Sequence, residues 1–232
     1  MTVVRYADRP DLLERRGELN GFPEYMAHNA MGWKYWGRLY KEFPAFQLVL
    51  EDGGELAAEV HALPVHVDAE LPAGWDDAFE RGMERGAGNV LCLLAIAVQP
   101  QRRGGGVAGA MIEAARRAAA DEGLTAVIAP VRPTLKSSYP LIPIEQYIEW
   151  RRDDGSHFDP WIRVHERAGA TIVQAAPRSM LIEAPVADWE AWTGMRLPAD
   201  GTYVVPELLA PLEVRDGVGV HLEPNVWLRH SL

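Results

Sequence analysis

Hydrophobic positions follow two different spacings along the chain, and together they predict a mixed α/β fold. Apolar runs of strand length lie at 46–50, 55–67 and 90–98, and the Glu-Asp-Gly-Gly junction at 51–54 is typical of the turn in a β-hairpin. The run at 90–98 is apolar at nearly every position, which indicates a strand buried on both faces. A short strand at 3–7 and a helix at 11–18 are expected before these runs.

The segment after the strand at 90–98 changes to a helical spacing. One helical face collects the apolar residues Val107, Ala110, Met111, Ala114, Ala115 and Ala118. Gly123 predicts the end of this helix, and 124–129 reads as the returning strand. Because a strand, glycine loop, helix and strand follow one another, part of the sheet is expected to be parallel.

Four further helices, one of them a short helix at 144–152, and a final pair of strands are expected. Residues 23–43 are rich in aromatic side chains, and 72–88 forms a surface helix or excursion. Asp159 and Pro160 are suited to the N-cap and first turn of a helix that runs to about Ala168. The last strands are expected at 171–173 and 179–182, before a tail that is too apolar to be a disordered extension.

Composition narrows the function classes. The chain has 232 residues, 48% of them hydrophobic, and a formal net charge of −10, which argues against a general nucleic-acid or membrane-surface binder. No apolar run reaches the roughly 20 residues that span a bilayer, and the N-terminus lacks a signal-peptide pattern. We therefore expect a cytoplasmic protein, and the Arg and Ala bias fits a GC-rich bacterial genome.

No metal site is expected. His61 and His66 lie on one predicted strand an odd number of residues apart, so they should point to opposite faces. The single Cys92 cannot form a multi-cysteine site, and its place in an apolar strand favours a buried hydrophobic role.

The glycine-rich loop at 99–106 allows three interpretations. Gly104, Gly106 and Gly109 satisfy G-x-G-x-x-G, but a dinucleotide site needs these glycines directly after the strand and an acidic residue about 20 positions later. Residues 99–103 intervene and 125–132 contain no acid, so this interpretation fails, as does a P-loop. A flexible turn without ligand stays open, and so does an anion site at the helix N-terminus.

The stretch Val98-Gln-Pro-Gln-Arg-Arg-Gly-Gly-Gly-Val-Ala108 closely resembles the acyl-CoA-binding segment of the GNAT acetyltransferase superfamily, with Arg103, Gly106 and Ala108 as the core of the signature. The resemblance extends over about 3–184 and implies a mixed, mostly antiparallel sheet flanked by helices. It implies that backbone groups of Ile96, Ala97 and Val98 pair with the pantetheine arm. It also implies that the pyrophosphate is wrapped by the N–H groups of Arg103, Gly104, Gly105, Gly106, Val107 and Ala108.

Acetyl transfer to an amine needs a free amine, a polarised thioester carbonyl and a proton for the departing thiolate. Many family members supply that proton from a Tyr in a Tyr-x-x-x-Gly-Phe pattern, and His165 stands in its place here. His165 is therefore the candidate acid, with a packed core histidine as the alternative. Glu59 and His61 share one face of their strand and are the candidate bases, with a solvated surface position as the alternative.

The acceptor pocket is expected to involve the aromatic segments. Residues 130–158 form a longer connection than a minimal family member uses, and such loops often bind ligands. We expect Tyr35, Tyr139, Tyr147 and Trp150 to line the pocket, unless 130–158 is a surface excursion packed against the tail.

These inferences give a GNAT domain at 1–184 with an insertion at about 130–158, and a C-terminal extension at 185–232 packed on the domain or on a partner subunit, which leaves a homodimer open. The expected reaction moves an acetyl or short acyl group from coenzyme A to a small-molecule amine. Two alternatives remain: a donor held on the phosphopantetheine arm of an acyl carrier protein, and a non-catalytic acyl-CoA sensor.

Overall fold

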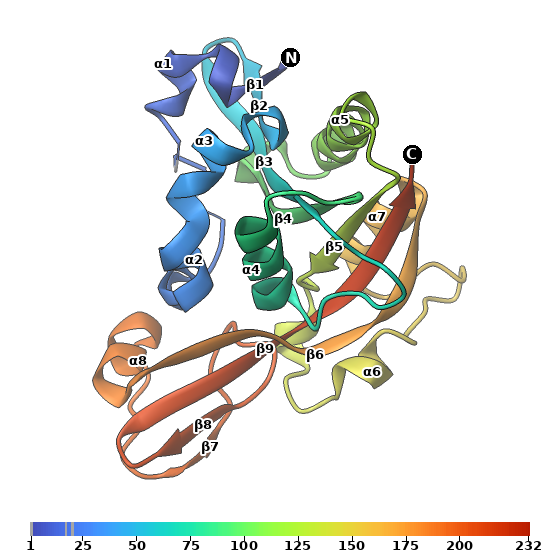
Figure 1. The fold of residues 1–232 in the computed structure, drawn as a ribbon. Helices are drawn as coiled ribbons and strands as arrows, with labels where there is room; N and C mark the ends of the chain where they lie inside the picture. Colours follow the sequence, from blue (N-terminus) through green and yellow to red (C-terminus); the bar gives the residue numbers. More distant parts are fainter. Residues whose placement is uncertain (1, 17, 20) are drawn as a thin grey trace.

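The computed structural model describes residues 2–16, 18–19 and 21–232, and it forms one large sheet with helices on both faces (Figure 1). The strands are β1 (Thr2–Arg5), β2 (Gln47–Asp52), β3 (Glu55–Val65), β4 (Val90–Val98), β5 (Ala126–Val131), β6 (Ala170–Pro185), β7 (Gly201–Tyr203), β8 (Leu212–Arg215) and β9 (Val218–Ser231). The helices are α1 (Pro10–Leu13), α2 (Ala30–Tyr35), α3 (Leu39–Glu42), α4 (Trp75–Arg85), α5 (Val107–Asp121), α6 (Ile144–Tyr147), α7 (Pro160–Arg167) and α8 (Val186–Thr193).

The sheet is mixed and mostly antiparallel, as the sequence predicts. Its order is β1-β2-β3-β4-β5-β9-β8-β7, with β6 paired to β9, and the β4–β5 pair is parallel. All other strand pairs in the described residues are antiparallel. Gly53 and Gly54 form the β2–β3 turn, where both have positive φ (63° and 87°), a conformation that glycine adopts without steric cost.

Two features of β4 open the sheet at its centre. The parallel pairing of β4 and β5 is limited to Leu91 with Val127 and Cys92 with Ile128. Against β3, the register shifts so that His61 faces Ala95 while Ala62 faces Leu93, which leaves Leu94 as a β-bulge. Beyond the bulge β4 and β5 no longer pair, and ligands have room between them.

Helices cover the two faces in pairs. Figure 1 shows α2 and α4 in front of the sheet and α5 and α7 behind it, and each pair packs together. The buried face of α5 consists of Val107, Met111, Ile112, Ala115 and Ala119, so it shares three residues with the predicted stripe, of which Ala110 is exposed. α7 begins as predicted, because Asp159 accepts hydrogen bonds from the backbone N–H of Trp161 and Ile162 at 2.9 and 3.3 Å.

Three predicted elements differ from the structure. The single helix expected at 23–43 is a series of short α- and 3-10 segments, including α2 and α3. The pair of strands expected at 171–173 and 179–182 is one long strand, β6, whose pairing with β9 is interrupted by register shifts. The helix expected at 11–18 includes residue 17, which lies outside the described residues, and α1 ends at Leu13.

The C-terminal segment is part of the central sheet. β9 pairs with β5 along one edge and with β6 along the other, and Trp227 at its centre is fully buried. The division into folding units at 1–184 and 185–232 stays a prediction. In the structure β9, which follows residue 184 in sequence, pairs with β5 and β6, which precede or end at that boundary. None of the helices in the described part of the chain is long and apolar enough to cross a bilayer.

Replacement of Gly74 by alanine is expected to lower the free energy of unfolding by about 1–3 kcal/mol, a typical cost of overpacking. A Cβ on Gly74 would lie 2.2 Å from the Ser179 Cα on β6, whereas a Cβ on Gly37 would have open space. Urea denaturation of Gly74→Ala and of the control Gly37→Ala tests this. Equal stability of the two variants would contradict the tight approach of α4 to β6.

Candidate active site

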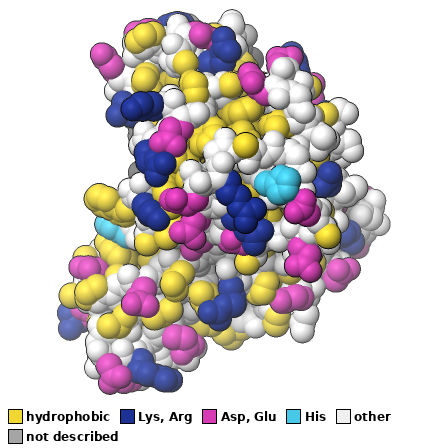
Figure 2. All heavy atoms as spheres, viewed as in Figure 1, with side chains coloured by type: hydrophobic (Ala, Val, Ile, Leu, Met, Phe, Trp, Pro, Cys, Tyr) yellow, Lys and Arg dark blue, Asp and Glu magenta, His cyan; other side chains and the backbone are white. Residues whose placement is uncertain are grey.

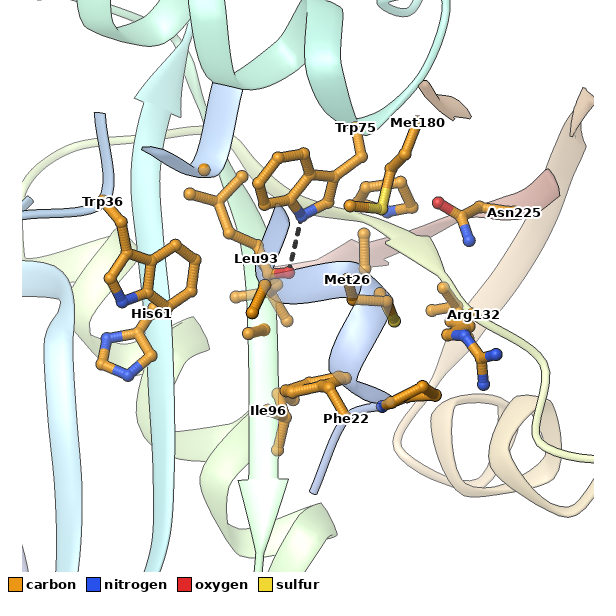
Figure 3. A pocket seen from close by; sticks show the side chains of 18 of the residues that line it. Phe22, Met26, Trp36, His61, Trp75, Leu93, Ile96, Arg132, Met180 and Asn225 are labelled. Carbon is orange, nitrogen blue, oxygen red and sulfur yellow. Dashed lines mark hydrogen bonds between the residues drawn. The ribbon is translucent and has the colours of Figure 1, made fainter. Parts of the chain in front are cut away.

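The diverging ends of β4 and β5 border a cavity of about 590 Å³ (Figure 3). Most of its wall is apolar, and the residues come from segments far apart in sequence: Phe22, Met26, Trp36, Trp75, Leu93, Ile96 and Met180. Its polar side chains include Glu59, His61, Arg132, His165 and Asn225. A largely apolar cavity with a few converging polar groups is typical of a small-molecule site.

The β4 bulge lies in the wall of this cavity. Leu93, Leu94, Ala95 and Ile96 all line it. The Trp75 Nε1–H donates a hydrogen bond to the Leu94 carbonyl at 2.8 Å (Figure 3), so the bulge is held from α4. Peptide groups that do not pair with a neighbouring strand are available to a ligand.

The glycine loop follows β4 and leads into α5. Gly104 and Gly106 have φ values of 82° and 79°, and Gly106 is the N-cap of α5 with no side-chain hydrogen bond to the helix. The first N–H groups of a helix have no partner within the helix, and they carry the positive end of its dipole. The loop can therefore bind an anionic group next to the open end of β4.

His165 on α7 is held by a second histidine. His230 Nδ1 lies 3.4 Å from the Ala168 carbonyl oxygen, and His165 Nδ1 lies 3.0 Å from His230 Nε2. Because a carbonyl only accepts, His230 carries its proton on Nδ1 and accepts on Nε2, so His165 donates from Nδ1. His165 Nε2 is then unprotonated, is buried, and has no hydrogen-bond partner in the described chain.

The electrostatics agree with a neutral His165. Burial lowers the pKa of His165 to about 3, and the neighbouring His230 adds to the effect. Burial also lowers the pKa of His230. At neutral pH His165, a residue of the cavity wall, is therefore neutral and carries a lone pair on its buried Nε2.

Stability is expected to fall as the pH drops below about 6.5. The unfolded chain takes up a proton on His165 near its ordinary pKa of 6.5, whereas the folded chain does not until about pH 3. Across that range His165 lowers the free energy of unfolding by about 1.4 kcal/mol for every unit that the pH falls. Urea unfolding at a series of pH values should show a shallower slope for His165→Phe than for the wild type, and an unchanged slope would contradict the assignment.

Glu59 and His61 lie together at another part of the cavity wall. Both are buried on the same face of β3, as their spacing predicts, with His61 Nε2 3.4 Å from Glu59 Oε2. The Tyr6 hydroxyl donates to Glu59 at 2.7 Å, and His61 Nδ1 lies 3.2 Å from Gln47 Oε1. Burial raises the pKa of Glu59, but the hydrogen bonds and charge of His61 and the Tyr6 hydroxyl outweigh it, so Glu59 is ionised.

The sequence and fold can now be compared with known proteins. Residues 11–142 match the model of the acetyltransferase (GNAT) family. The chain belongs to the GNAT acetyltransferase family. It is similar to the arginine N-acetyltransferase avaD of Aspergillus versicolor, with 31% identity over 97% of this chain and 92% of that protein. This GNAT protein is an N-acyltransferase.

Two solved structures share the GNAT fold over nearly the whole chain. The loading GNATL domain of CurA from Lyngbya majuscula has a TM-score of 0.63 and 18% identity, covering 99% of this chain and 96% of that one. The GphF GNAT-like decarboxylase in complex with isobutyryl-CoA has a TM-score of 0.60 and 17% identity, covering 100% and 99%. At these identities the likeness shows the fold alone.

The structure of this GNAT enzyme separates the predicted donor-binding residues into groups. Ile96 lines the large cavity, whereas Ala97 and Val98 line a separate hollow of about 270 Å³ with Gln99 and Pro100. The residues of the loop and first turn of α5, from Arg103 to Ala108, lie beyond both at the end of β4. Their contacts with a donor stay a prediction.

The predicted acceptor residues lie outside the described wall of the large cavity. Tyr35 is fully buried and donates to Glu84 Oε1 at 2.6 Å. Tyr147 is also fully buried and donates to Asp159 Oδ2 at 2.8 Å, while Trp150 packs edge-on against Tyr139. These side chains therefore do not line the large cavity, and their hydroxyl and ring contacts lie in the core and the 130–158 segment. Their part in acceptor binding stays a prediction.

Other residues of the wall were missed. Trp36, Trp75, Arg132 and Asn225 line the cavity, but only Arg132 gave a usable signal: it follows a buried strand directly, at the end where the sheet opens. Asn225 lies in the tail, and sequence reasoning did not place the tail in the sheet.

Three of the four arginines near the glycine loop are ion-paired, and the fourth, Arg103, is exposed and donates to the Val98 carbonyl. Arg102 pairs with Asp52 and Glu55, and Arg116 and Arg117 both pair with Glu113. The face seen in Figure 2 likewise carries basic and acidic side chains interspersed. These ion pairs weaken the case for docking of an acidic carrier protein at this place.

Proposed function

We propose that this GNAT enzyme transfers an acetyl or short acyl group from coenzyme A to the amine of a small molecule held in the large cavity. The observation that carries the proposal is the unpartnered, unprotonated Nε2 of buried His165 in the wall of a cavity that opens between β4 and β5. A buried acceptor atom without a partner costs stability, which favours a functional role.

The donor fits the open part of the sheet. We place the pyrophosphate at the N–H groups of the loop and first turn, where Gly104 and Gly106 supply the left-handed backbone. The pantetheine arm would follow the open edge of β4 past Val98, Ala97 and Ile96. The thioester carbonyl would then accept a hydrogen bond from a backbone N–H of residues 93–96, which line the cavity, whereas Ala97 and Val98 do not.

The proposed chemistry uses His165 as a proton relay. The amine nitrogen attacks the thioester carbon, and its N–H becomes acidic as the C–N bond forms. His165 Nε2 accepts that proton and passes it to the sulfur as the C–S bond breaks, leaving an amide and a free thiol. Because His165 is neutral at rest, it protonates the thiolate only after it has taken the proton from the amine.

Glu59 and His61 are proposed to assist the acceptor. Glu59 is ionised and lines the cavity, so its carboxylate can attract an arriving ammonium group and take up its proton. The relative that acetylates arginine makes arginine the first acceptor to test. We further place the reaction in the cytoplasm, without a nucleic-acid or membrane partner, and association through the C-terminal segment stays a prediction.

The experiment is an acylation screen that follows thiol release from acetyl-CoA, propionyl-CoA and acetylated carrier protein with a panel of amines that includes arginine. Release that depends on both the amine and acetyl-CoA supports the proposal, and mass spectrometry identifies the amide. Release from the carrier protein alone would support the carrier-dependent alternative. Tight binding of acetyl-CoA without transfer to any amine would support an acyl-CoA sensor.

A further inference from the structure

The guanidinium of Arg132 lies at one end of the cavity and uses only some of its nitrogens for hydrogen bonds within the described residues. Arg132 directly follows β5, lines the cavity and has a side chain 20% exposed. Its Nε donates to Glu223 Oε1, and its Nη2 donates to the Tyr25 hydroxyl at 2.9 Å and to the Glu207 carbonyl at 2.6 Å. Within the described residues nothing accepts a hydrogen bond from Nη1, so that nitrogen is available to a ligand.

Arg132 forms an ion pair with Glu223. The Glu223 carboxylate is fully buried on β9, and its Oε2 lies 2.6 Å from His221 Nε2 and 3.3 Å from the Tyr25 hydroxyl. The carboxylate is therefore shared between the guanidinium and the imidazole. These charge-assisted hydrogen bonds hold the guanidinium in place at the cavity wall.

Asn225 adds an unsatisfied acceptor at the same end. Its side chain is 1% exposed, its Nδ2 donates to the Pro224 carbonyl at 3.0 Å, and its Oδ1 has no partner in the described chain. Figure 3 shows Arg132 and Asn225 on one side of the cavity, opposite Trp36 and His61. A buried carbonyl oxygen without a donor costs about 1–3 kcal/mol, so a ligand N–H there would be favourable.

We propose that Arg132 and Asn225 form a subsite for an α-amino acid, in which Arg132 binds the carboxylate and Asn225 Oδ1 accepts a hydrogen bond from the α-amine. This inference rests on the proposed function. The neutral α-amine keeps its lone pair for the thioester, so the α-nitrogen is the acylated atom. The apolar remainder of the wall accommodates the amino-acid side chain.

Matched acceptor pairs test the subsite on the unaltered enzyme. L-Arginine is compared with agmatine, and L-phenylalanine with phenethylamine, so that each pair differs by the carboxylate. We expect kcat/KM to be about 10- to 100-fold higher for the better-accepted amino acid than for its decarboxylated partner, the range of a charge-assisted hydrogen bond. Fragmentation of the product by mass spectrometry should place the acyl group on the α-nitrogen.

Variants then assign the preference to Arg132. Arg132→Lys keeps a cation beside Glu223 but loses the planar fork, and we expect it to reduce the preference for the carboxylate about 10-fold with an unchanged KM for acetyl-CoA. The double variant Arg132→Gln/Glu223→Gln removes both charges together and should abolish the preference without leaving a buried charge unpaired. Arg163→Lys is the matched control, because Arg163 donates to the carbonyls of His157 and Phe158 outside the cavity.

The outcomes separate the subsite from the proposed function. Equal kcat/KM within both pairs, or acylation of a side-chain nitrogen, would overturn the subsite and leave the transferase function intact. If neither member of a pair is acylated, the proposed transfer to that acceptor fails. Calorimetric titration with the same compounds then tests the subsite alone. Binding that requires the carboxylate supports the subsite, and equal or absent binding rejects it.

Discussion

Replacing His165 by asparagine or phenylalanine is expected to lower kcat by about 10²- to 10⁴-fold, the usual contribution of a positioned acid–base group. Asparagine can still donate to His230 from the position of the His165 Nδ1, which lies 3.0 Å from His230 Nε2, but it has no counterpart of Nε2. Phenylalanine keeps the ring that packs edge-on against Trp161 at 4.6 Å. Both variants thus lack Nε2, the proposed proton acceptor, and each retains a different contact of the His165 side chain.

Thiol release at saturating acetyl-CoA measures the effect, and thermal unfolding checks that both variants fold. The KM for acetyl-CoA should stay within about threefold of the wild type, because His165 is not among the loop residues that we assign to the pyrophosphate. His66→Phe is the control, since His66 is exposed and paired with Asp68. If folded His165→Asn and His165→Phe retain wild-type kcat, His165 is a core histidine and the relay is wrong.

The second large effect is expected at Gly106. A valine there must adopt φ near 79°, a conformation that costs an L-residue about 1–2 kcal/mol, and its side chain would extend over the N–H groups proposed to bind the pyrophosphate. Since a Cβ at Gly106 meets nothing within 4 Å, the rest of the fold is not overpacked. We expect affinity for acetyl-CoA to fall by about 10- to 100-fold.

Calorimetric titration with acetyl-CoA measures this loss. Gly109→Ala is the matched control, because Gly109 lies inside α5 and its Cβ would also have open space. That control should bind acetyl-CoA normally and gain about 0.5–1 kcal/mol of stability. Unchanged affinity in Gly106→Val would place the donor elsewhere and remove the basis for the proposed pyrophosphate site.

Local signals in the sequence were sufficient to predict the elements around the glycine loop. Glycines with positive φ form the turn at 53–54 and the loop at 104–106, and Asp159 caps α7. In each case the structural preference resides in the residue itself or in neighbours within a few positions. The resemblance to the GNAT family rested on the same loop, and the family assignment was confirmed.

Long-range pairing decided the rest of the sheet. No local pattern indicates that β9 enters between β5 and β6, because strand pairing between distant segments depends on the whole arrangement. Aromatic side chains were equally ambiguous: Tyr147 and Tyr35 are core residues, whereas Trp36 and Trp75 line the cavity. Composition and spacing do not distinguish an aromatic ring that faces a cavity from one that fills the core.

Short-range backbone preferences were enough to predict the glycine loop, the helix that follows it and the place of His165 on α7. The tertiary structure alone decided what His165 can do. His230 lies 65 residues away and fixes the tautomer of His165, and burial keeps the imidazole neutral. Only the fold brings Arg132 and Asn225 to one end of the cavity, because β9 pairs with β5 there.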